Sequence, residues 1–561
     1  MSGFYGDRFS AMREMLTGGP LDVLTGDYLA ELTMLILGRQ RLKNPDAGYA
    51  STFLRQLEDC LGLAIDNGVR IVSNAGGLNP AGLAAAVAAL GDRLGIPVKV
   101  GYVHGDDLLP TAGQLGLDGA LTANAYLGGW GIAECLRAGA DVVVTGRVTD
   151  ASLVAGPAAA HFGWGRTDFD ALAGATVAGH VIECGAQATG GNYSFFTEVA
   201  DLGRPGFPIA EIHGDGAAVI TKHPGTGGAV TVETVTAQLL YEIGGPRYLG
   251  PDVTSRFDTI GLADDGPDRV RITGVRGEAP PAEVKVCLNT FAGFRNSATF
   301  VLCGLDIEAK AALARRQLAD EVGGEGIDWT LARTDRADAD TEETASALLH
   351  ATIRTPDAKH AKRFSRACVE LALASYPGFT LTAPPADGTP VGVYRPEFVP
   401  QDAVAHIAVL PDGSSSTIEP PAATAARGEL PADAAAPGEL PADTVPPLPG
   451  GPTRRVPLGT AFGARSGDKG GDANLGVWAR GAAGYRWLAQ ELTVERLREL
   501  LPETAKLDID RHPLPNLRAV NFVLHGLLGA GVAASTRFDP QAKALAEWLR
   551  SRLVDLPEVL L

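Results

Sequence analysis

Cysteine and positive charge are both scarce in this chain of 561 residues. Its six cysteines form no CxxC pair and follow no regular spacing, which excludes a disulfide framework and a cysteine-rich zinc site and suits a reducing compartment. Lys and Arg number 48 against 66 Asp and Glu, for a formal net charge of −18. We expect such a chain to bind neither nucleic acid nor an anionic membrane, because both need clustered positive charge.

Long apolar runs are missing as well. The longest, such as residues 29–37, fall well short of the ~20 residues that a membrane-spanning helix needs. Residues 1–13 include several charges and no apolar stretch, so we expect no secretory signal and a cytoplasmic location. The chain also has no HExxH, EF-hand, Walker A or GxGxxG motif, and we therefore expect neither a metal nor a bound cofactor.

Glycine, by contrast, is abundant: 70 of 561 residues, or about one in eight, against a usual ~7%. This favours many tight turns with backbone close to a ligand. In the first third of the chain, strands rich in Val and Ile alternate with helices rich in Ala and Leu. The strands are expected at 69–74, 97–103 and 141–145, and the helices at 81–94, 132–138 and 150–161. Strands that are apolar throughout are typical of a parallel α/β sheet buried on both faces.

The pattern changes from about residue 209, where shorter β segments with Gly- and Pro-rich turns are expected. These segments are 218–221, 229–235, 270–275 and 283–288. Over 297–375 the order strand, helix, strand, strand, helix then favours a ferredoxin-like unit. The middle portion of the fold is therefore predicted to be α+β.

A stretch rich in Pro, Ala, Gly and Glu at 420–452 holds a direct repeat, GELPAD, at 428–433 and 438–443. Such a composition buries too little apolar surface to offset its ordering entropy, and it predicts a tether. The domains that we expect are an α/β core over 1–415 with an internal boundary near 270, a linker over 416–455, and a small, separate α+β domain over 456–561.

Polar, glycine-rich segments at the ends of strands are the candidate site, because ligands bind outside the carboxyl ends of the strands in parallel α/β sheets. Residues 73–80 (SNAGGLNP) contain Asn74 and Asn79, and they form either a substrate-binding turn or a plain one. After the strand at 141–145, Arg147 suits a carboxylate or phosphate, and Asp150 is either a general base or a helix N-cap.

Two further segments carry candidate residues. In 183–193 (ECGAQATGGNY), Cys184 is either a nucleophile or a small buried hydrophobe, while Gln187 and Asn192 suit hydrogen bonds to a substrate. Lys222 and His223 precede a glycine-rich loop and suit a phosphate or thioester oxygen, although an exposed hairpin explains them equally well. In the C-terminal domain, 465–474 (RSGDKGGDAN) is either an anion-binding nest or a tight β-hairpin.

Several of these strings, taken in order along the chain, resemble the acyclic terpene utilisation AtuA family. They are SNAGGLNP (73–80), ADVVVTGRVTDASL (140–153), HVIECGAQATGGNY (180–193), GFPIAEI (206–212), ITKHPGTGG (220–228) and ARSGDKGGDANLGV (464–477). The C-terminal portion is similar to the family's ferredoxin-like module. The resemblance implies a setting in the degradation of terpenoid acids as CoA thioesters, alongside a biotin-dependent acyl-CoA carboxylase and a hydratase. It brings no catalytic residues with it.

We therefore expect a cytosolic enzyme of branched or terpenoid acid catabolism that acts on an acyl-CoA or a related carboxylate, with CoA as part of the substrate. Lyase, hydratase or isomerase chemistry suits these residues, because they favour proton abstraction next to a polarised carbonyl. In this hypothesis Arg147 and Lys222 bind anionic oxygens, and Asp150 or His223 moves the proton. The residues expected to orient the substrate are Asn124, Gln187 and Asn192.

Two alternatives stay open at this point. The first is thioester hydrolysis or acyl transfer through Cys184. The second is a non-catalytic accessory subunit that docks onto an acyl-CoA carboxylase, as the tethered C-terminal domain suggests. A scaffold needs apolar interface residues rather than Arg, Asp, Asn and Gln placed around glycines, which favours the enzyme. Chains of this class commonly form homo-oligomers, and we expect one here.

Overall fold

The structure is a computed structural model that describes residues 1–3, 6–422, 424 and 450–561. Most of the predicted tether, including its repeat, lies outside the described residues. The chain divides into two compact units. The first consists of 1–289, 394–532 and 541–561, and the second consists of 290–393 and 533–540. The sequence suggested an internal boundary near residue 270, whereas the second unit begins at Thr290.

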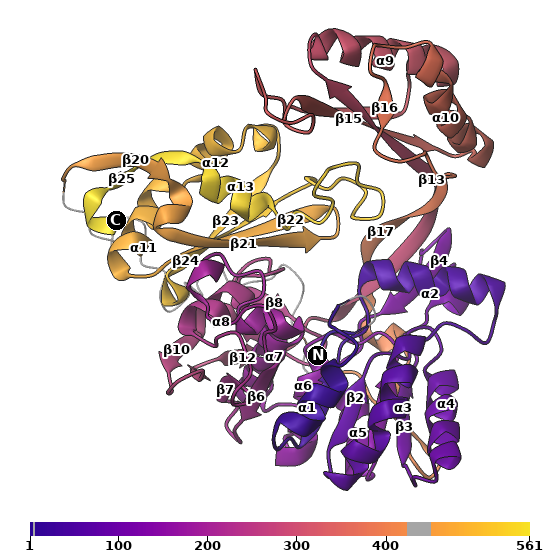
Figure 1. Ribbon diagram of the computed structural model, residues 1–561. Coiled ribbons are helices and arrows are strands. Elements are labelled where there is room, and N and C mark those ends of the chain that lie inside the picture. Colours follow the sequence, from indigo (N-terminus) through magenta and orange to yellow (C-terminus); the bar gives the residue numbers. More distant parts are fainter. Residues whose placement is uncertain (4–5, 423, 425–449) are drawn as a thin grey trace. The chain divides into compact units, whose positions relative to one another are not determined.

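The N-terminal part of the first unit is built on a mostly parallel sheet (Figure 1). Its parallel strands are, in spatial order, β1 (Val23–Gly26), β2 (Arg70–Ser73), β5 (Val142–Thr145) and β3 (Val100–His104). The antiparallel strands β18 (Ile407–Val409) and β19 (Ser415–Thr417) extend the sheet beyond β3. The three strands expected in the first third of the chain are thus present in a parallel arrangement.

Helices cover both faces of this sheet. Successive residues of β5 show the alternation, since Val142 and Val144 pack with the helices on one face and Val143 packs with those on the other. The first face carries α3 (Ser51–Asp66) and α4 (Pro80–Leu94), and the second carries α5 (Trp130–Arg137) and α6 (Ser152–Phe162). Helices α1 (Ala11–Gly18) and α2 (Glu31–Lys43) and strand β4 (Ala120–Ala125) complete this part. The predicted α/β core is confirmed.

The middle of the first unit is α+β. Helix α7 (Phe169–Ile182) and helix α8 (Val232–Leu239) pack with two small antiparallel sheets. One sheet has the order β10 (Gly261–Asp264), β11 (Val270–Thr273), β7 (Ala218–Lys222), β6 (Pro208–Ile212), and the other has β12 (Arg276–Glu278), β9 (Thr254–Arg256), β8 (Arg247–Leu249). The β segment expected at 229–235 is wrong. Thr231 caps the N-terminus of α8 by accepting from the Thr234 N–H, which favours a helix there.

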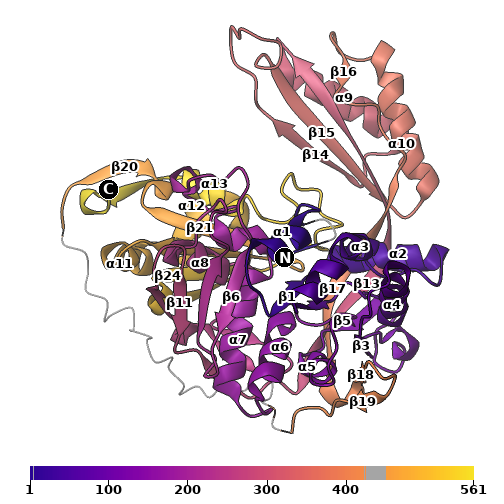
Figure 2. The ribbon, with the colours of Figure 1, turned by 60° about the horizontal axis from the view of Figure 1, so that its bottom comes forward.

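The second unit has the order β13 (Glu283–Cys303), α9 (Ile307–Val322), β14 (Ile327–Ala332), β15 (Ser346–Thr355), α10 (Ala358–Glu370), β16 (Thr380–Leu381). Its antiparallel sheet runs β14-β15-β13-β16, with both helices on one face (Figure 2). This is the ferredoxin-like arrangement that the sequence favoured for 297–375. The unit begins within β13 and ends within β17 (Thr389–Pro400), so each of these strands continues into the first unit.

The C-terminal domain has an antiparallel sheet of order β21 (Phe462–Lys469), β22 (Asp472–Ala479), β24 (Ala519–Leu524), β23 (Ile509–Leu514). Its helices are α11 (Ala482–Glu491), α12 (Val494–Leu500) and α13 (Leu545–Ser551), and β20 (Thr453–Pro457) pairs with β25 (Leu553–Pro557). The domain has a core of its own, but Trp478, Leu514, Leu517 and Ala519 pack into the core of the middle portion. Of the two alternatives for 465–474, the β-hairpin is what forms.

Candidate active site

Arg147 is the central residue of the candidate site and lies in the loop between β5 and α6. Its Nη1 donates to Asp150 Oδ1 at 2.7 Å and to the Leu29 carbonyl oxygen at 3.2 Å, and its guanidinium lies 4.2 Å from the centroid of the Tyr126 ring. Only 2% of its side chain is exposed, and its Nε has no hydrogen-bond partner among the described residues. A buried guanidinium with an unused N–H group is suited to bind an anionic oxygen.

Three carboxyl groups surround this guanidinium. Asp27 follows β1, Asp150 precedes α6, and Glu183 stands at the end of α7. Their charges act on one another and on Arg147. The side chain of Asp150 is 29% exposed, so solvent reaches the cluster. Asp27 and Asp150 both follow the carboxyl ends of parallel strands, where an α/β sheet binds its ligand.

Burial sets the protonation of two of these groups. It raises the pKa of Asp27 and of Glu183 well above the ordinary value of each, and the charge of Asp150 raises both further against the opposing effect of Arg147. Glu183 Oε2 is buried and has no hydrogen-bond partner in the described part of the chain. A carboxylic acid that keeps its proton next to an ion-paired carboxylate provides a proton donor and a proton acceptor in one site.

A second group of charges adjoins Arg147 through Tyr126. The Tyr126 hydroxyl donates to Glu31 Oε1 at 2.8 Å, and Lys285 Nζ lies 3.6 Å from the same oxygen and 4.6 Å from the Tyr126 ring centroid. Burial raises the pKa of Glu31, but Lys285 and Arg147 outweigh it and lower that pKa to about 2. Glu31 therefore stays ionised at physiological pH, and two cations, Arg147 and Lys285, lie near the Tyr126 ring.

Buried polar groups fix the backbone of Arg147. Asp106 Oδ2 accepts the Arg147 N–H at 2.8 Å and the Asn124 Nδ2–H at 2.8 Å. Burial raises the pKa of Asp106 to about 7. Asn124, which the sequence analysis expected to orient the substrate, is completely buried and donates to Asp106. Its contact in the structure therefore positions the arginine loop.

The C-terminal domain adds side chains to the same region. Arg465 donates to Gln187 Oε1 and, at 3.1 Å, to the Asn192 carbonyl oxygen, and its guanidinium lies 4.4 Å from the Tyr241 ring centroid. Gln187 and Asn192 were expected to orient the substrate. The structure brings both of them to Arg465 at the junction between the core and the C-terminal domain.

The two asparagines predicted in 73–80 have different surroundings. Asn74 Nδ2 donates to Asp27 Oδ1 at 2.6 Å, and Asn74 Oδ1 accepts the Tyr28 N–H at 2.6 Å, so Asn74 belongs to the cluster and orients Asp27. Asn79 caps α4, since its Oδ1 accepts the Gly82 N–H at 2.9 Å. Its Nδ2 donates to the Asp46 carbonyl oxygen, so both of these hydrogen bonds hold backbone groups in place.

Lys222 and His223 make their contacts elsewhere. Lys222 Nζ donates to the Thr226 carbonyl oxygen at 2.7 Å and lies 3.0 Å from Asp268 Oδ2. His223 Nε2 lies 3.0 Å from the Met15 carbonyl oxygen, and the ring packs on Gly18 and Gly19. Both side chains are buried in these contacts. They hold a loop and the N-terminal helix together, and the hydrogen bonds described do not link them to Arg147.

Cys184 lies beside the cluster in surroundings that oppose its activation. Burial raises the pKa of this thiol well above its usual value, and the charges of Glu183, Glu242 and Asp27 raise it further. His180, four residues earlier, has its Nδ1 3.3 Å from Glu183 Oε1, and its ring contacts the Tyr248 ring at a tilt of 51°. Burial lowers the pKa of His180 to about 4, so it is neutral at physiological pH. A nucleophilic cysteine needs the opposite, an electropositive setting.

Several residues of the cluster were not among the sequence-based candidates. They are Asp27, Glu31, Glu183, Glu242, Lys285 and Lys469. Asp27 and Glu183 had a usable signal, since Asp27 follows a short apolar strand and Glu183 lies inside a string that was singled out. Lys469 also lies inside a singled-out string, 464–477, whereas Lys285 and Glu242 lie outside all of these strings, and only folding brings them near.

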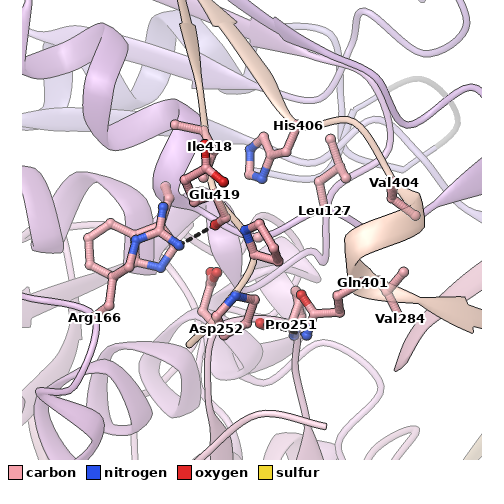
Figure 3. Close-up of a pocket in the computed structure, with 14 residues that line it drawn as sticks. Leu127, Arg166, Pro251, Asp252, Val284, Gln401, Val404, His406, Ile418 and Glu419 are labelled. Atoms are coloured by element: carbon pink, nitrogen blue, oxygen red, sulfur yellow. Dashed lines mark hydrogen bonds between the residues drawn. The ribbon is translucent and has the colours of Figure 1, made fainter. Parts of the chain in front are cut away.

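A separate small cavity lies near β18 and β19 (Figure 3). Its polar lining includes Arg166, Asp252 and His406, and its volume is about 40 Å³. Asp252 accepts the Gly129 N–H at 2.6 Å, and Arg166 donates to the Glu419 carbonyl oxygen at 2.5 Å. A cavity of this size has room for a few water molecules rather than for a substrate. We therefore place the candidate active site at Arg147.

Two further features bear on the class of protein. No group of three or more His, Cys, Asp or Glu side chains in the described ranges has an arrangement suited to a metal ion. No helix among the residues described has both the length and the apolar character needed to cross a bilayer.

Comparison with known families agrees with these motifs. The model of the acyclic terpene utilisation family protein AtuA matches residues 1–410, and the model of the AtuA ferredoxin-like domain matches residues 456–555. No curated protein and no solved structure matches the chain. The first match alone spans more than half of the chain, and it contains Arg147, Asp27, Asp150 and Glu183 together with the α/β core. The chain therefore belongs to the AtuA family of acyclic terpene utilisation.

Proposed function

We propose that this protein is an enzyme of acyclic terpenoid acid catabolism that moves protons on an acyl thioester or carboxylate, in a lyase, hydratase or isomerase reaction. The observation that carries the proposal is the cluster around Arg147. It combines a buried guanidinium with an unused N–H, an ion-paired carboxylate open to solvent, and carboxyl groups that hold protons.

In this proposal each group has one role. Arg147 binds an oxygen of the carboxylate or thioester carbonyl through its free N–H. Glu183, as a carboxylic acid, donates a hydrogen bond to the oxygen on which negative charge develops. Asp150 removes a proton from the carbon next to the carbonyl. Lys285 lies at the Tyr126 side of the cluster and suits a more distant anionic group of the substrate.

Other candidates receive less support from their contacts. Lys222 contacts the Thr226 carbonyl and Asp268, and His223 contacts the Met15 carbonyl. We therefore assign neither residue a role in the reaction. The surroundings of Cys184 oppose the thiolate form, which weakens hydrolysis or acyl transfer through that residue. An accessory subunit does not explain a buried Arg147 whose Nε finds no partner among the described residues, beside carboxyls that hold protons.

The first experiment is thermal unfolding of the full chain with citronellic acid, its CoA thioester and free CoA. A ligand at 100 times its Kd adds about 2.7 kcal/mol to the free energy of unfolding. We expect the thioester or the acid to raise the melting temperature by a few degrees and free CoA to raise it less. A flat panel would contradict the proposal and favour the accessory subunit, which a pull-down with an acyl-CoA carboxylase would then test.

The second experiment tests the chemistry directly. The thioester is incubated with the protein in D2O, and loss of the proton next to the carbonyl is followed by NMR. We expect exchange by the native protein and a fall of about 100-fold or more in Asp150→Asn, because removal of a general base costs 10²–10⁴-fold. The matched control is Asp22→Asn, an exposed carboxyl outside the cluster, which keeps the full rate. Full exchange by Asp150→Asn would remove Asp150 from the scheme.

A further inference from the structure

Two cations of the candidate site, Arg147 and Lys285, lie close to one aromatic ring. The Arg147 guanidinium is 4.2 Å from the Tyr126 ring centroid, and Lys285 Nζ is 4.6 Å from the same centroid. The two charges are therefore no more than about 9 Å apart, the sum of these distances. Cations are attracted to such a ring by its electron-rich face. A ligand group bound at one cation thus has the other within reach of a short chain.

Backbone hydrogen bonds on both sides of the Tyr126 Cα fix this spacing. The Tyr126 N–H, directly after β4, donates to the Lys285 carbonyl oxygen in β13 at 2.9 Å. The next N–H, that of Leu127, donates to the Arg147 carbonyl oxygen at 3.2 Å. Two adjacent residues therefore join the segments that carry the two cations. A ligand would meet a preformed pair, which lowers the cost of binding.

The two cations differ in how solvent reaches them. Arg147 is the buried one, with 2% of its side chain exposed and an Nε that finds no partner among the described residues. Lys285 has 37% of its side chain exposed, and its Nζ lies 3.6 Å from one carboxylate oxygen, Glu31 Oε1. An ammonium group has three N–H donors, so this contact leaves donors for a ligand. Arg147 thus forms the inner end of the site and Lys285 the outer end.

A tyrosine hydroxyl adds a donor at the outer end. The ring centroid of Tyr394, in β17, lies 5.7 Å from Lys285 Nζ. Its hydroxyl is buried and makes no hydrogen bond of regular geometry in the described part of the chain. The tip of the β21–β22 hairpin packs on this ring, since a Cβ at Gly470 would lie 3.0 Å from Tyr394 Cε1. A carboxylate bound by Lys285 offers this hydroxyl an acceptor.

We propose that the substrate is a dicarboxylic acid or its monothioester, with one carbonyl group on Arg147 and a second, free carboxylate on Lys285. The proposal rests on the proposed function, for which it names the substrate class. An acid with a single carboxylate would use Arg147 and leave Lys285 and the Tyr394 hydroxyl without a ligand. The spacing of the cations favours a short chain between the two groups of the substrate. The phosphates of CoA are the other source of anionic oxygens for Lys285, and the test separates the two.

The first test measures binding to the full chain by isothermal titration calorimetry. Glutaryl-CoA and pentanoyl-CoA are matched probes, because they differ only in a carboxylate that replaces the terminal methyl group. We expect glutaryl-CoA to bind at least 10-fold more tightly. Lys285→Met should reduce this preference to less than twofold by weakening glutaryl-CoA alone, and Lys285→Arg, which keeps the charge, should retain it. The matched control is Lys43→Met, which removes an exposed charge from the last turn of α2 and should keep the full preference.

Two results of this titration would overturn the proposal. Equal affinity of the native protein for both thioesters would show that the site does not recognise a second carboxylate. Equal weakening of both by Lys285→Met would show that Lys285 binds the phosphates of CoA instead.

A second measurement needs neither CoA nor turnover. Lysines are methylated reductively with limiting formaldehyde, and peptide mapping follows the rate at Lys285. We expect glutarate to slow this rate at least threefold and pentanoate to leave it unchanged, while the rate at Lys43 responds to neither. No protection by glutarate, together with no binding of either thioester, would also overturn the proposal. A protein that prefers glutaryl-CoA through Lys285 but exchanges no proton of it in D2O would overturn the proposed function and leave the substrate class standing.

Discussion

Asp106, Asp27 and Glu183 show that position rather than residue type decides how a carboxyl behaves in this protein. All three lie in the first unit, and burial is the largest cause of the raised pKa in each. The Glu31 side chain is 29% exposed, and Lys285 and Arg147 hold it ionised. The balance between desolvation and a nearby cation therefore assigns proton donors and permanent anions within one cluster.

Asp106 makes the stability of the protein depend on pH. Its pKa is about 7 in the folded chain against 3.8 as its ordinary value, so folded molecules keep this proton over a range in which unfolded ones have lost it. The contribution of Asp106 is fully present below about pH 4 and is lost as the pH rises to about 7, at up to about 1.4 kcal/mol per pH unit. Asp106→Asn should flatten this slope between pH 5 and 7 in calorimetry, whereas Asp22→Asn should keep it. An unchanged slope in Asp106→Asn would contradict the assignment.

Cys184 provides a test of the thiol alternative. Since burial and Glu183 keep this thiol protonated, Cys184→Ser should leave proton exchange on the thioester within about twofold of native. Iodoacetamide at pH 7 should modify Cys184 more slowly than it modifies free cysteine, as followed by mass spectrometry. Rapid alkylation accompanied by loss of activity would restore the cysteine to the mechanism.

At the scale of the elements, helix caps and glycines that allow close backbone contact determine how helices and strands are placed around the site. Thr231 begins α8 and Asn79 begins α4, each by accepting a backbone N–H of the first helical turn. The β21–β22 hairpin depends instead on missing side chains, because glycines let it contact 240–244. The Gly- and Asn-rich string at 73–80 therefore begins a helix, whereas the similar string at 464–477 forms a contact between domains.

Variants of Asn79 test whether this residue acts only as a helix cap or also contacts the substrate. If it acts only as a cap, Asn79→Ala should lower the free energy of unfolding by about 1 kcal/mol, and Asn79→Ser should restore most of it, since serine is also a good N-cap. Neither variant should change the thermal shift produced by the thioester. A lost shift at retained stability would show that Asn79 contacts the substrate, as the sequence analysis expected.

At the scale of the whole molecule, the C-terminal domain and the α/β core are parts of one unit. Trp478 is 1% exposed and packs in the core of the middle portion, and Arg480 forms ion pairs with Glu198 and Glu233. The sequence treats 456–561 as separate, because a composition typical of a tether precedes it. Its apolar contacts with the core join residues that are far apart in the chain, so no local sequence pattern indicates them.

Trp478→Ala tests whether the C-terminal domain and the rest of the first unit unfold together. Removal of a buried tryptophan costs about 3–5 kcal/mol, and here the loss should lower the stability of the core and of the C-terminal domain together. We expect a single calorimetric transition for the first unit that shifts as a whole. Tyr485→Ala, in the domain's own core, serves as the comparison. A transition of the C-terminal domain alone that moves while the rest stays would show that the two parts fold independently.

The sequence alone predicted strands β2, β3 and β5 and helices α4, α5 and α6 of the α/β core, because each follows a local apolar pattern, but it did not predict β1, β18, β19 or helices α1 to α3. Helix α9 and strand β24 were expected at the bounds that the structure has, and Arg147, Asp150 and Asn74 were found from strand ends. The apolar pattern gave a wrong prediction at α8, where the cap formed by Thr231 favours a helix instead of the expected β segment.

Only the tertiary structure decided which residues make up the candidate active site. Lys222 and His223 have the right chemistry in sequence, but folding commits them to Asp268 and to the Met15 carbonyl. Lys285 became a candidate because residues far apart in the chain share one desolvated space, in which each charge shifts the others. Sequence patterns record neighbours along the chain, whereas desolvation and Coulomb interactions depend on distance in space, and that distance exists only once the chain has folded.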